Sequence, residues 1–175
     1  AAPSAPVGED ALAGLDLELG FAPHGRVTLA SLLGQTARFD AATAAWTAGR
    51  VRTLVEGPVM SSWLYHSPLA GHPHLSAWFE VRAYAQGETE VLPWLENGWL
   101  DRPAPTSYAG ELSLRWMGST RLSQNLDLPH HCRAVALMGH LPYRRTPSQW
   151  AEVQHDTEHL QRTGLVPSYQ AGVNE

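Results

Sequence analysis

Residues 75–85 constrain the fold more than any other part of the sequence, because two kinds of side chain alternate along them without a break. One set is small or apolar: Ala77, Phe79, Val81 and Ala83. The other set is aromatic or charged: Trp78, Glu80, Arg82 and Tyr84. Successive side chains of a β-strand point to opposite faces, whereas a helix repeats every 3.6 residues. The stretch is therefore predicted to be a strand with one face in a core.

Further segments indicate that this strand belongs to a mostly β domain. Alternation recurs at residues 50–56, 108–117 and 121–128, and shorter strand-like runs lie at 26–33, 59–66, 89–96 and 133–138. Gly and Pro separate most of these runs, which favours tight turns. About eight strands with short connections predict an antiparallel β-sandwich or an irregular barrel. Pro93 cannot donate a ladder hydrogen bond, so its strand is expected at an edge or at a bulge.

The chain divides into three predicted parts. Residues 1–25 are rich in Ala, Pro and Gly and read as a linker or an extended edge segment, in which one short alternating run, 12–19, is a candidate strand. Residues 26–147 form the predicted sandwich, in which 39–49 is a short helical turn or loop and 67–74 is a turn. Residues 148–175 hold a closing helix, near 148–163, and an exit linker, because Trp150, Val153 and Leu160 share one helical stripe. The Gly- and Pro-bounded ends suggest excision from a longer chain.

Composition excludes several classes of protein. The chain has 175 residues, of which 43% are hydrophobic and 17% charged, and this is globular composition. Its formal net charge is -5 and its longest basic run is Arg144–Arg145, so nucleic acid is not an expected partner. No window reaches the roughly 18 apolar residues of a membrane helix, so no membrane partner is expected. The single cysteine, Cys132, rules out an internal disulfide framework.

Histidines supply the candidate metal ligands. His155 and His159 lie four residues apart in the predicted helix, a spacing at which two imidazoles can share a zinc ion. His130 and Cys132 offer two more zinc-type ligands. A hydrolase site would need His155, His159 and a further ligand such as His130, but Asp156 stands where zinc proteases carry the general base Glu. We therefore expect no cofactor, and a zinc-dependent hydrolase is kept as an alternative. The run 72–74, His-Pro-His, is expected to be an exposed turn.

The charged and aromatic face of residues 75–85 is the candidate ligand-binding site. Trp78 and Tyr84 can contact sugar rings, and Glu80 and Arg82 can hydrogen-bond sugar hydroxyls. The competing interpretation is that this face packs against a second sheet or another domain. A carboxylate pair for glycoside hydrolysis is invisible in sequence, and the residues to inspect for it are Glu80, Glu96 and Asp127. The nucleophile elbow, the phosphate-binding loop and the dinucleotide fingerprint are all missing from the sequence.

Parts of the chain resemble a known family. The relevant runs are 57–59 (Gly-Pro-Val), 81–87 (Val-Arg-Ala-Tyr-Ala-Gln-Gly) and 96–97 (Glu-Asn), with weaker similarity at 127–133 and 155–156. These resemble the N-terminal β region of exo-rhamnogalacturonan lyases and YetA-like proteins, closest to uncharacterised bacterial and prophage members. The resemblance implies a β module ahead of a large helical toroid that carries the catalytic residues. It also implies an extracellular or virion-associated location.

These observations lead to a ranked set of functions. The first expectation is a non-catalytic β-sandwich module of a larger carbohydrate-associated or phage-derived protein. Its partners would be a polysaccharide or other protein domains of the same parent, so that it binds glycan or organises that parent. The alternative is a structural component of a phage particle or tail that docks a protein partner, and the zinc-dependent hydrolase ranks last.

Overall fold

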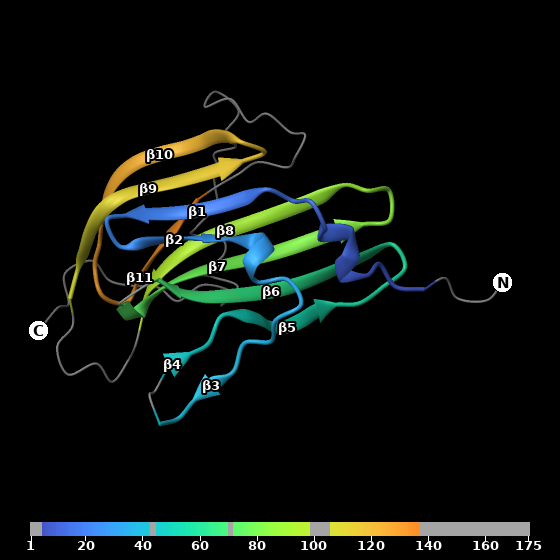
Figure 1. The fold of residues 1–175 in the computed structure, drawn as a ribbon, viewed down its shortest axis with the longest axis horizontal. Coiled ribbons are helices and arrows are strands. Elements are labelled where there is room, and N and C mark those ends of the chain that lie inside the picture. Colours follow the sequence, from blue (N-terminus) through green and yellow to red (C-terminus); the bar gives the residue numbers. More distant parts are fainter. Residues whose placement is uncertain (1–4, 43–44, 70–71, 99–105, 137–175) are drawn as a thin grey trace, which may run out of the picture. The chain divides into compact units, whose positions relative to one another are not determined.

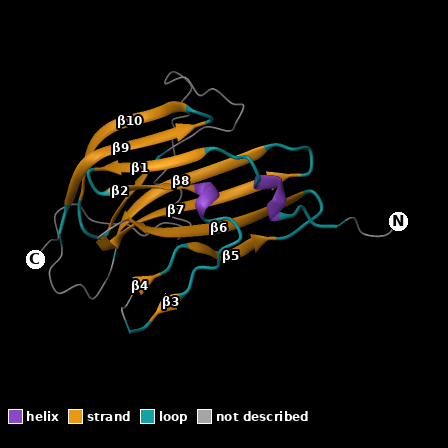
Figure 2. Ribbon diagram, viewed as in Figure 1, coloured by secondary structure: helices purple, strands orange, loops and turns teal. Residues whose placement is uncertain are grey.

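A computed structural model describes residues 5–42, 45–69, 72–98 and 106–136 (Figure 1). Strands make up 63% of this part of the chain. Its helical segments are two short 3₁₀ helices, η1 (Glu9–Leu12) and η2 (Leu29–Ser31), as Figure 2 shows. The predicted mostly β, antiparallel fold is thus confirmed. The predicted closing helix near 148–163 lies outside the described residues.

The strands form two large antiparallel sheets and one short hairpin. The four-stranded sheet has the order β10-β9-β1-β2. It is built from β1 (Leu17–Ala22), β2 (Gly25–Thr28), β9 (Tyr108–Trp116) and β10 (Ser119–Leu128). The five-stranded sheet has the order β11-β8-β7-β6-β5. It is built from β5 (Gly49–Val55), β6 (Met60–Leu69), β7 (His72–Tyr84), β8 (Thr89–Asn97) and β11 (Cys132–Val135). The hairpin pairs β3 (Phe39–Asp40) with β4 (Ala45–Trp46).

One hydrophobic core joins the inner faces of the two large sheets. The apolar set of β7 is fully buried, with Phe79 at 0% exposure, as the alternation predicts. The same cluster contains Leu19 of β1 and Leu112 and Leu114 of β9. Burying each such aliphatic side chain contributes roughly 1.5–3 kcal/mol relative to exposure. The sheets therefore pack face to face in a sandwich-like arrangement, and in the described residues they do not close into a barrel.

The N-terminal boundary differs from the prediction. Residues 17–22 fall in the range predicted as a linker or edge segment, yet they form β1, an inner strand between β9 and β2. β1 overlaps the candidate strand over 12–19 only at its start, and the earlier residues 9–12 form η1 instead. Leu17, Leu19 and Phe21 are buried on alternate positions, so β1 supplies a full row of the core. The strand expected over 26–33 ends at Thr28, and η2 begins at the next residue, Leu29.

Two connections also differ from expectation. Residues 39–49 hold the β3–β4 hairpin rather than a helical turn. Residues 67–69 continue β6, and β7 begins at His72, so the connection between them is shorter than the predicted turn over 67–74.

Pro93 lies in β8, which pairs with β7 along its whole length but with β11 only from Trp94 to Asn97. The β11–β8 ladder runs from Cys132 opposite Asn97 to Val135 opposite Trp94. Beyond it, the backbone N–H of Ala136 donates to the Pro93 carbonyl at 3.0 Å. β8 is thus an inner strand without a register shift at Pro93, so the predicted edge or bulge is wrong. Proline is tolerated there because its missing N–H falls just beyond the end of β11.

A buried tyrosine ties η1 to the five-stranded sheet. Tyr65 of β6 is fully buried, and its hydroxyl donates to the Glu9 carboxylate. Arg50 of β5 also donates to that carboxylate, with Nη1 3.0 Å from Oε2. Burial, and then the hydrogen bond to Glu9, raise the pKa of Tyr65 far above its usual range. The phenol therefore stays neutral and acts as a permanent donor.

We expect Tyr65→Phe to lower the free energy of unfolding by about 1 kcal/mol, because it removes one hydrogen bond and keeps the ring. Glu9 keeps Arg50 as its partner, which limits the loss. Urea unfolding followed by circular dichroism measures the change. The matched control is Tyr84→Phe, whose hydroxyl lies 3.3 Å from Glu90 at the other face and should matter by less than about 0.5 kcal/mol. Equal effects of the two changes would contradict this role of Tyr65.

Candidate functional site

The outer face of the five-stranded sheet carries the predicted ligand-binding residues. Trp78, Glu80, Arg82 and Tyr84 are half-buried, whereas the residues between them are at most 1% exposed. The four side chains therefore share the face of β7 that points away from the core. Trp78 belongs to an aromatic group, and Glu80, Arg82 and Tyr84 belong to a charged group beside it. Each group also includes residues of neighbouring strands.

The first group is a continuous line of rings, which we call the aromatic row. Its members are Phe39, Trp46, His66, Trp78 and Trp94. In register, Trp78 lies opposite His66 of β6 and Trp94 of β8. The ring centroids are 4.6 Å apart for His66 and Trp78, and 5.8 Å apart for Trp78 and Trp94, whose planes differ by only 1°. Trp78 is thus held between rings from both neighbouring strands.

The rest of the row extends onto the β3–β4 hairpin. Trp46 lies 6.3 Å from His66 and 5.7 Å from Phe39, measured between ring centroids. The indole N–H of Trp78 donates to Ser76 Oγ at 3.0 Å, so its main polar group is already used within the sheet. Trp78 is therefore oriented by its neighbours before any ligand arrives.

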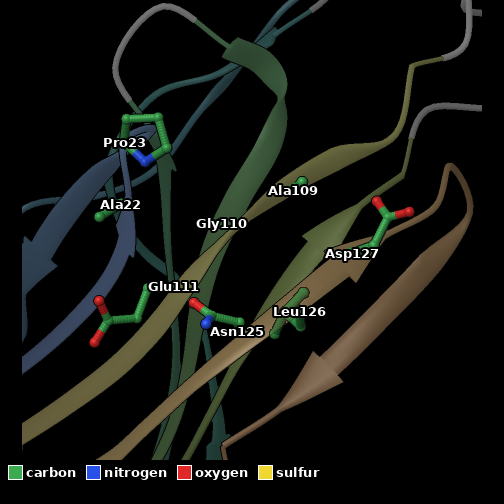
Figure 3. A pocket seen from close by; sticks show the side chains of 8 residues that line it. All are labelled: Ala22, Pro23, Ala109, Gly110, Glu111, Asn125, Leu126 and Asp127. Carbon is green, nitrogen blue, oxygen red and sulfur yellow. The ribbon is translucent and has the colours of Figure 1, made fainter.

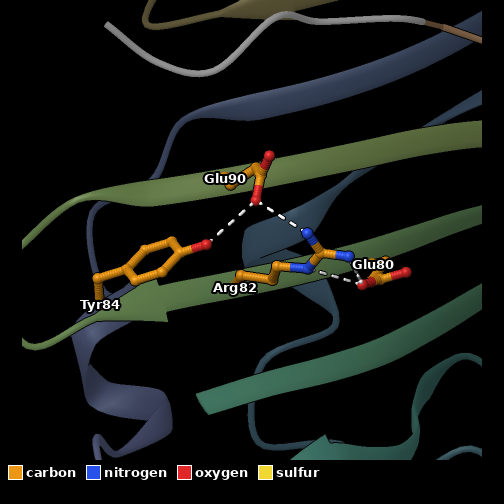
Figure 4. Close-up of polar contacts among 4 residues, drawn as sticks. All are labelled: Glu80, Arg82, Tyr84 and Glu90. Atoms are coloured by element: carbon orange, nitrogen blue, oxygen red, sulfur yellow. Dashed lines mark hydrogen bonds and ion pairs between the residues drawn. The ribbon is translucent and has the colours of Figure 1, made fainter. Parts of the chain in front are cut away.

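The second group is the Arg82 cluster, formed by Glu80, Arg82, Tyr84 and Glu90 (Figure 4). Arg82 Nη2 lies 2.7 Å from Glu80 Oε1, and Nη1 lies 3.1 Å from Glu90 Oε2. The Tyr84 hydroxyl donates to the same Glu90 oxygen at 3.3 Å. The hydrogen bond to Glu80 is the main reason why the pKa of Arg82 is raised. Two carboxylates against one guanidinium leave a net negative charge.

Sequence reasoning missed Glu90, although a signal for it was present. The hairpin at Gln86-Gly87 sets the register of β7 against β8, and that register places Glu90 directly opposite Arg82. A shallow depression of ≈ 100 Å³ lies over Glu80, Arg82, Glu90, Val91 and Leu92. Its polar atoms thus come from both strands of the hairpin.

His66 is the one titratable member of the aromatic row. It is 4% exposed, although it lies on the outer face, and its Nδ1 is 3.4 Å from the Thr47 carbonyl beside β4. Burial lowers the pKa of His66 to about 4. His66 is therefore neutral at physiological pH.

The predicted metal ligands do not converge in the described residues. His130 Nδ1 lies 3.4 Å from Asn97 Oδ1, and the buried Asn97 amide donates to the Leu128 carbonyl at 3.0 Å. Cys132 is a free, half-buried thiol opposite Asn97. Across the part of the chain that the structure describes, no three His, Cys, Asp or Glu side chains gather closely enough to hold a metal ion. His155 and His159 lie outside the described residues.

The three carboxylates proposed for glycoside hydrolysis are far apart. Glu96 lies opposite Ser76, four residues along β7 from Glu80, which is roughly 13 Å of strand. Catalytic carboxylate pairs lie roughly 5–9.5 Å apart. Glu96 also makes an ion pair with Arg133. Asp127 belongs to the other sheet, so these residues do not form a pair.

Asp127 instead lines a groove on the four-stranded sheet (Figure 3). The groove has a volume of ≈ 790 Å³ and is lined by residues 22–23, 109–111 and 125–127. Its second carboxylate, Glu111, accepts a hydrogen bond from Ser123 at 2.5 Å. Glu111 and Asp127 are both exposed, so neither lies in the desolvated surroundings typical of a catalytic acid.

Comparisons with known proteins give no relative for this chain. No protein-family model matches it, and neither a curated protein nor a solved structure does. The family resemblance of runs 57–59, 81–87 and 96–97 therefore stays a prediction. Within the described residues, no helix has the length and apolar character needed to cross a membrane.

Proposed function

We propose that this chain is a non-catalytic module of a larger protein and that the outer face of its five-stranded sheet binds a neutral carbohydrate. The observation that carries the proposal is the aromatic row lying beside the Arg82 cluster on one sheet face. Carbohydrate recognition needs apolar surface for the C–H groups of a sugar and fixed polar atoms for its hydroxyls. The two groups supply these side by side.

The charge balance of the Arg82 cluster favours a neutral ligand over an acidic one. Arg82 is already bonded to Glu80 and Glu90, and the cluster is negative overall. An acidic sugar would meet this negative charge without an uncommitted cation in the cluster. An ionised carboxylate accepts about four hydrogen bonds, so Glu80 and Glu90 keep lone pairs for sugar hydroxyls.

Apolar contact would come from Leu92 and the aromatic row. Leu92 lies directly opposite Glu80 and is 37% exposed. The rings of Trp78 and Trp94 are parallel and half-buried. Trp78 lies two residues from Glu80 on β7, and Trp94 lies two residues from Leu92 on β8. The resemblance to exo-rhamnogalacturonan lyases supports carbohydrate as the broad ligand class, and it implies that catalysis belongs to another domain of the parent. The preference for a neutral sugar rests on the charge of the Arg82 cluster alone.

The second candidate is docking of a protein partner on the same face, as in a phage particle or tail. Exposed apolar side chains favour it: Phe39 is 46% exposed and Val135, opposite Trp94, is 45% exposed. Aromatic residues are enriched at protein interfaces. We rank this second because the Arg82 cluster supplies the hydrogen-bonding groups that a sugar requires.

Isothermal titration calorimetry with neutral and acidic oligosaccharides tests the proposal. We expect a neutral oligosaccharide to bind more tightly than an oligogalacturonate. Arg82→Met should weaken that binding at least tenfold, or about 1.4 kcal/mol, because Glu80 and Glu90 lose the group that holds them. Arg26→Met is the control, since Arg26 pairs weakly with Glu18 on the four-stranded sheet.

Two results would count against carbohydrate binding. The first is the absence of binding by any tested sugar at millimolar concentration, together with self-assembly or capture of a protein partner. The second is tighter binding of the acidic sugar, which the charge of the Arg82 cluster opposes.

A further inference from the structure

Two histidines from different sheets meet nitrogen to nitrogen. His24 lies in the turn between β1 and β2, and His72 is the first residue of β7. His24 Nδ1 is 3.2 Å from His72 Nε2. The ring planes are inclined at 75° with centroids 4.9 Å apart, so the rings do not stack face to face. The contact therefore joins the two sheets through two imidazole nitrogens.

The other nitrogen of His24 fixes its tautomer. His24 Nε2 is 2.9 Å from the carbonyl oxygen of Ala109 on β9. A carbonyl oxygen only accepts, so Nε2 carries the proton and donates. In neutral His24 the lone pair is then on Nδ1, which points at His72.

This geometry matches half of a tetrahedral metal centre. Zinc–imidazole bonds are about 2.0–2.1 Å long, so two nitrogens on one tetrahedral ion lie about 3.3 Å apart. Metal-bound histidines also donate their second N–H to a carbonyl or carboxylate, as His24 does to Ala109. We propose that His24 and His72 bind one divalent transition-metal ion, which clips the β1–β2 turn to the start of β7.

The surroundings define what kind of site this is. Tyr108 lies 5.2 Å from His24 and 4.8 Å from His72 between ring centroids, and Phe21 lies 5.0 Å from His24. These rings position both imidazoles from the side. In the described ranges no third His, Cys, Asp or Glu joins the pair, so the described residues supply two protein ligands. His72 then carries its proton on Nδ1, and no net proton is lost.

The two-nitrogen set also predicts a metal preference. Imidazole suits zinc, copper and nickel, and affinity among divalent ions rises from Co²⁺ through Ni²⁺ to Cu²⁺. The ion binds the folded chain across two sheets, so it stabilises the folded state. The free energy of unfolding, and with it the melting temperature, rises with the logarithm of the ratio of ion concentration to Kd. Without metal, the same two nitrogens share a single hydrogen bond.

The test uses the full chain titrated with CuSO₄ or ZnCl₂ alone, followed by calorimetry and thermal melting. We expect one ion per chain, tighter binding of Cu²⁺ than of Zn²⁺, and a metal-dependent rise in melting temperature. His24→Gln and His72→Gln should each weaken binding at least tenfold and abolish the rise. His131→Gln is the control, because His131 is exposed and lies before β11.

Electron paramagnetic resonance of the copper complex supplies a readout that does not depend on stability. Hyperfine coupling from two imidazole nitrogens is expected in the wild type and from one in either variant. Variants that melt lower without metal remain informative, because the spectrum still counts the nitrogen ligands. The proposal is overturned if no ion binds at a ratio of one, or if binding survives either the His24→Gln or the His72→Gln substitution. Loss of binding in His155→Gln or His159→Gln instead would place the metal at that pair.

Discussion

Phe79→Ala should lower the free energy of unfolding by about 3–5 kcal/mol, the range for truncating a fully buried phenylalanine. Phe79 is 0% exposed in the middle of β7, the central strand of its sheet. Its neighbours across the ladders are Tyr65 and Pro93, both buried. Urea unfolding monitored by circular dichroism gives the value.

The matched variant is Trp78→Ala, one residue along the same strand. Trp78 is larger than Phe79 but half-buried on the outer face, so its truncation should cost less, about 1–2 kcal/mol. The contrast tests the two-faced character of β7. Equal losses would mean that the outer face is a second core and is not available to a ligand.

The second large effect is a loss of stability in mild acid through His66. Burial lowers the pKa of His66 to about 4, against 6.5 for the ordinary side chain. Below pH 6.5 the unfolded chain gains a proton that the folded chain does not take up until about pH 4. Stability is therefore full above pH 6.5 and falls as the pH drops towards 4. From about pH 7.5 to about pH 5 the loss is about 2 kcal/mol.

His66→Gln provides the comparison, because glutamine does not titrate and can still donate to the Thr47 carbonyl. The free energy of unfolding should change less between the two pH values in this variant than in the wild type. Carboxylates titrate equally in both proteins, so the difference between them isolates His66. The same pH dependence in both proteins would show that His66 is accessible to protons in the folded state.

The central sheet could be predicted from sequence because its signals are local. Strict alternation over 75–85 identifies the two faces of β7, and the buried set has at most 1% exposure. The Gln86-Gly87 turn was visible too, and Gly87 takes a positive φ of 89° there, which glycine adopts without steric cost. Alternation over 108–117 likewise identifies the buried face of β9, which carries Leu112, Leu114 and Trp116.

Elements that depend on distant partners could not be predicted in the same way. The alternating run over 12–19 signals a strand there but misplaces β1, which is stabilised by pairing with β9, whose residues lie more than 80 positions away. β3 and β4 have two residues each, too few for any periodicity. Their position follows from Trp46 packing near His66, which is a tertiary contact.

The candidate site could be predicted only in part, because only its residues on a single strand carry a local signal. Residues on one strand share a face, so Trp78, Glu80, Arg82 and Tyr84 were evident together. Their partners from other strands, Glu90, Trp94 and His66, required the register of β6 and β8. The His24–His72 pair could not be predicted, because His24 lies in a turn of the four-stranded sheet and His72 lies in a strand of the five-stranded sheet.

The most direct test of carbohydrate binding at the outer face of the five-stranded sheet is an NMR titration. ¹⁵N–¹H spectra would be recorded while a neutral oligosaccharide is added to the full chain. We predict that the indole N–H signals of Trp78 and Trp94 and the guanidinium Nε signal of Arg82 shift together, with one dissociation constant. Unchanged signals at these three groups, with shifts at Ala109, Glu111 and Asp127 along the groove of the four-stranded sheet, would contradict the proposed site.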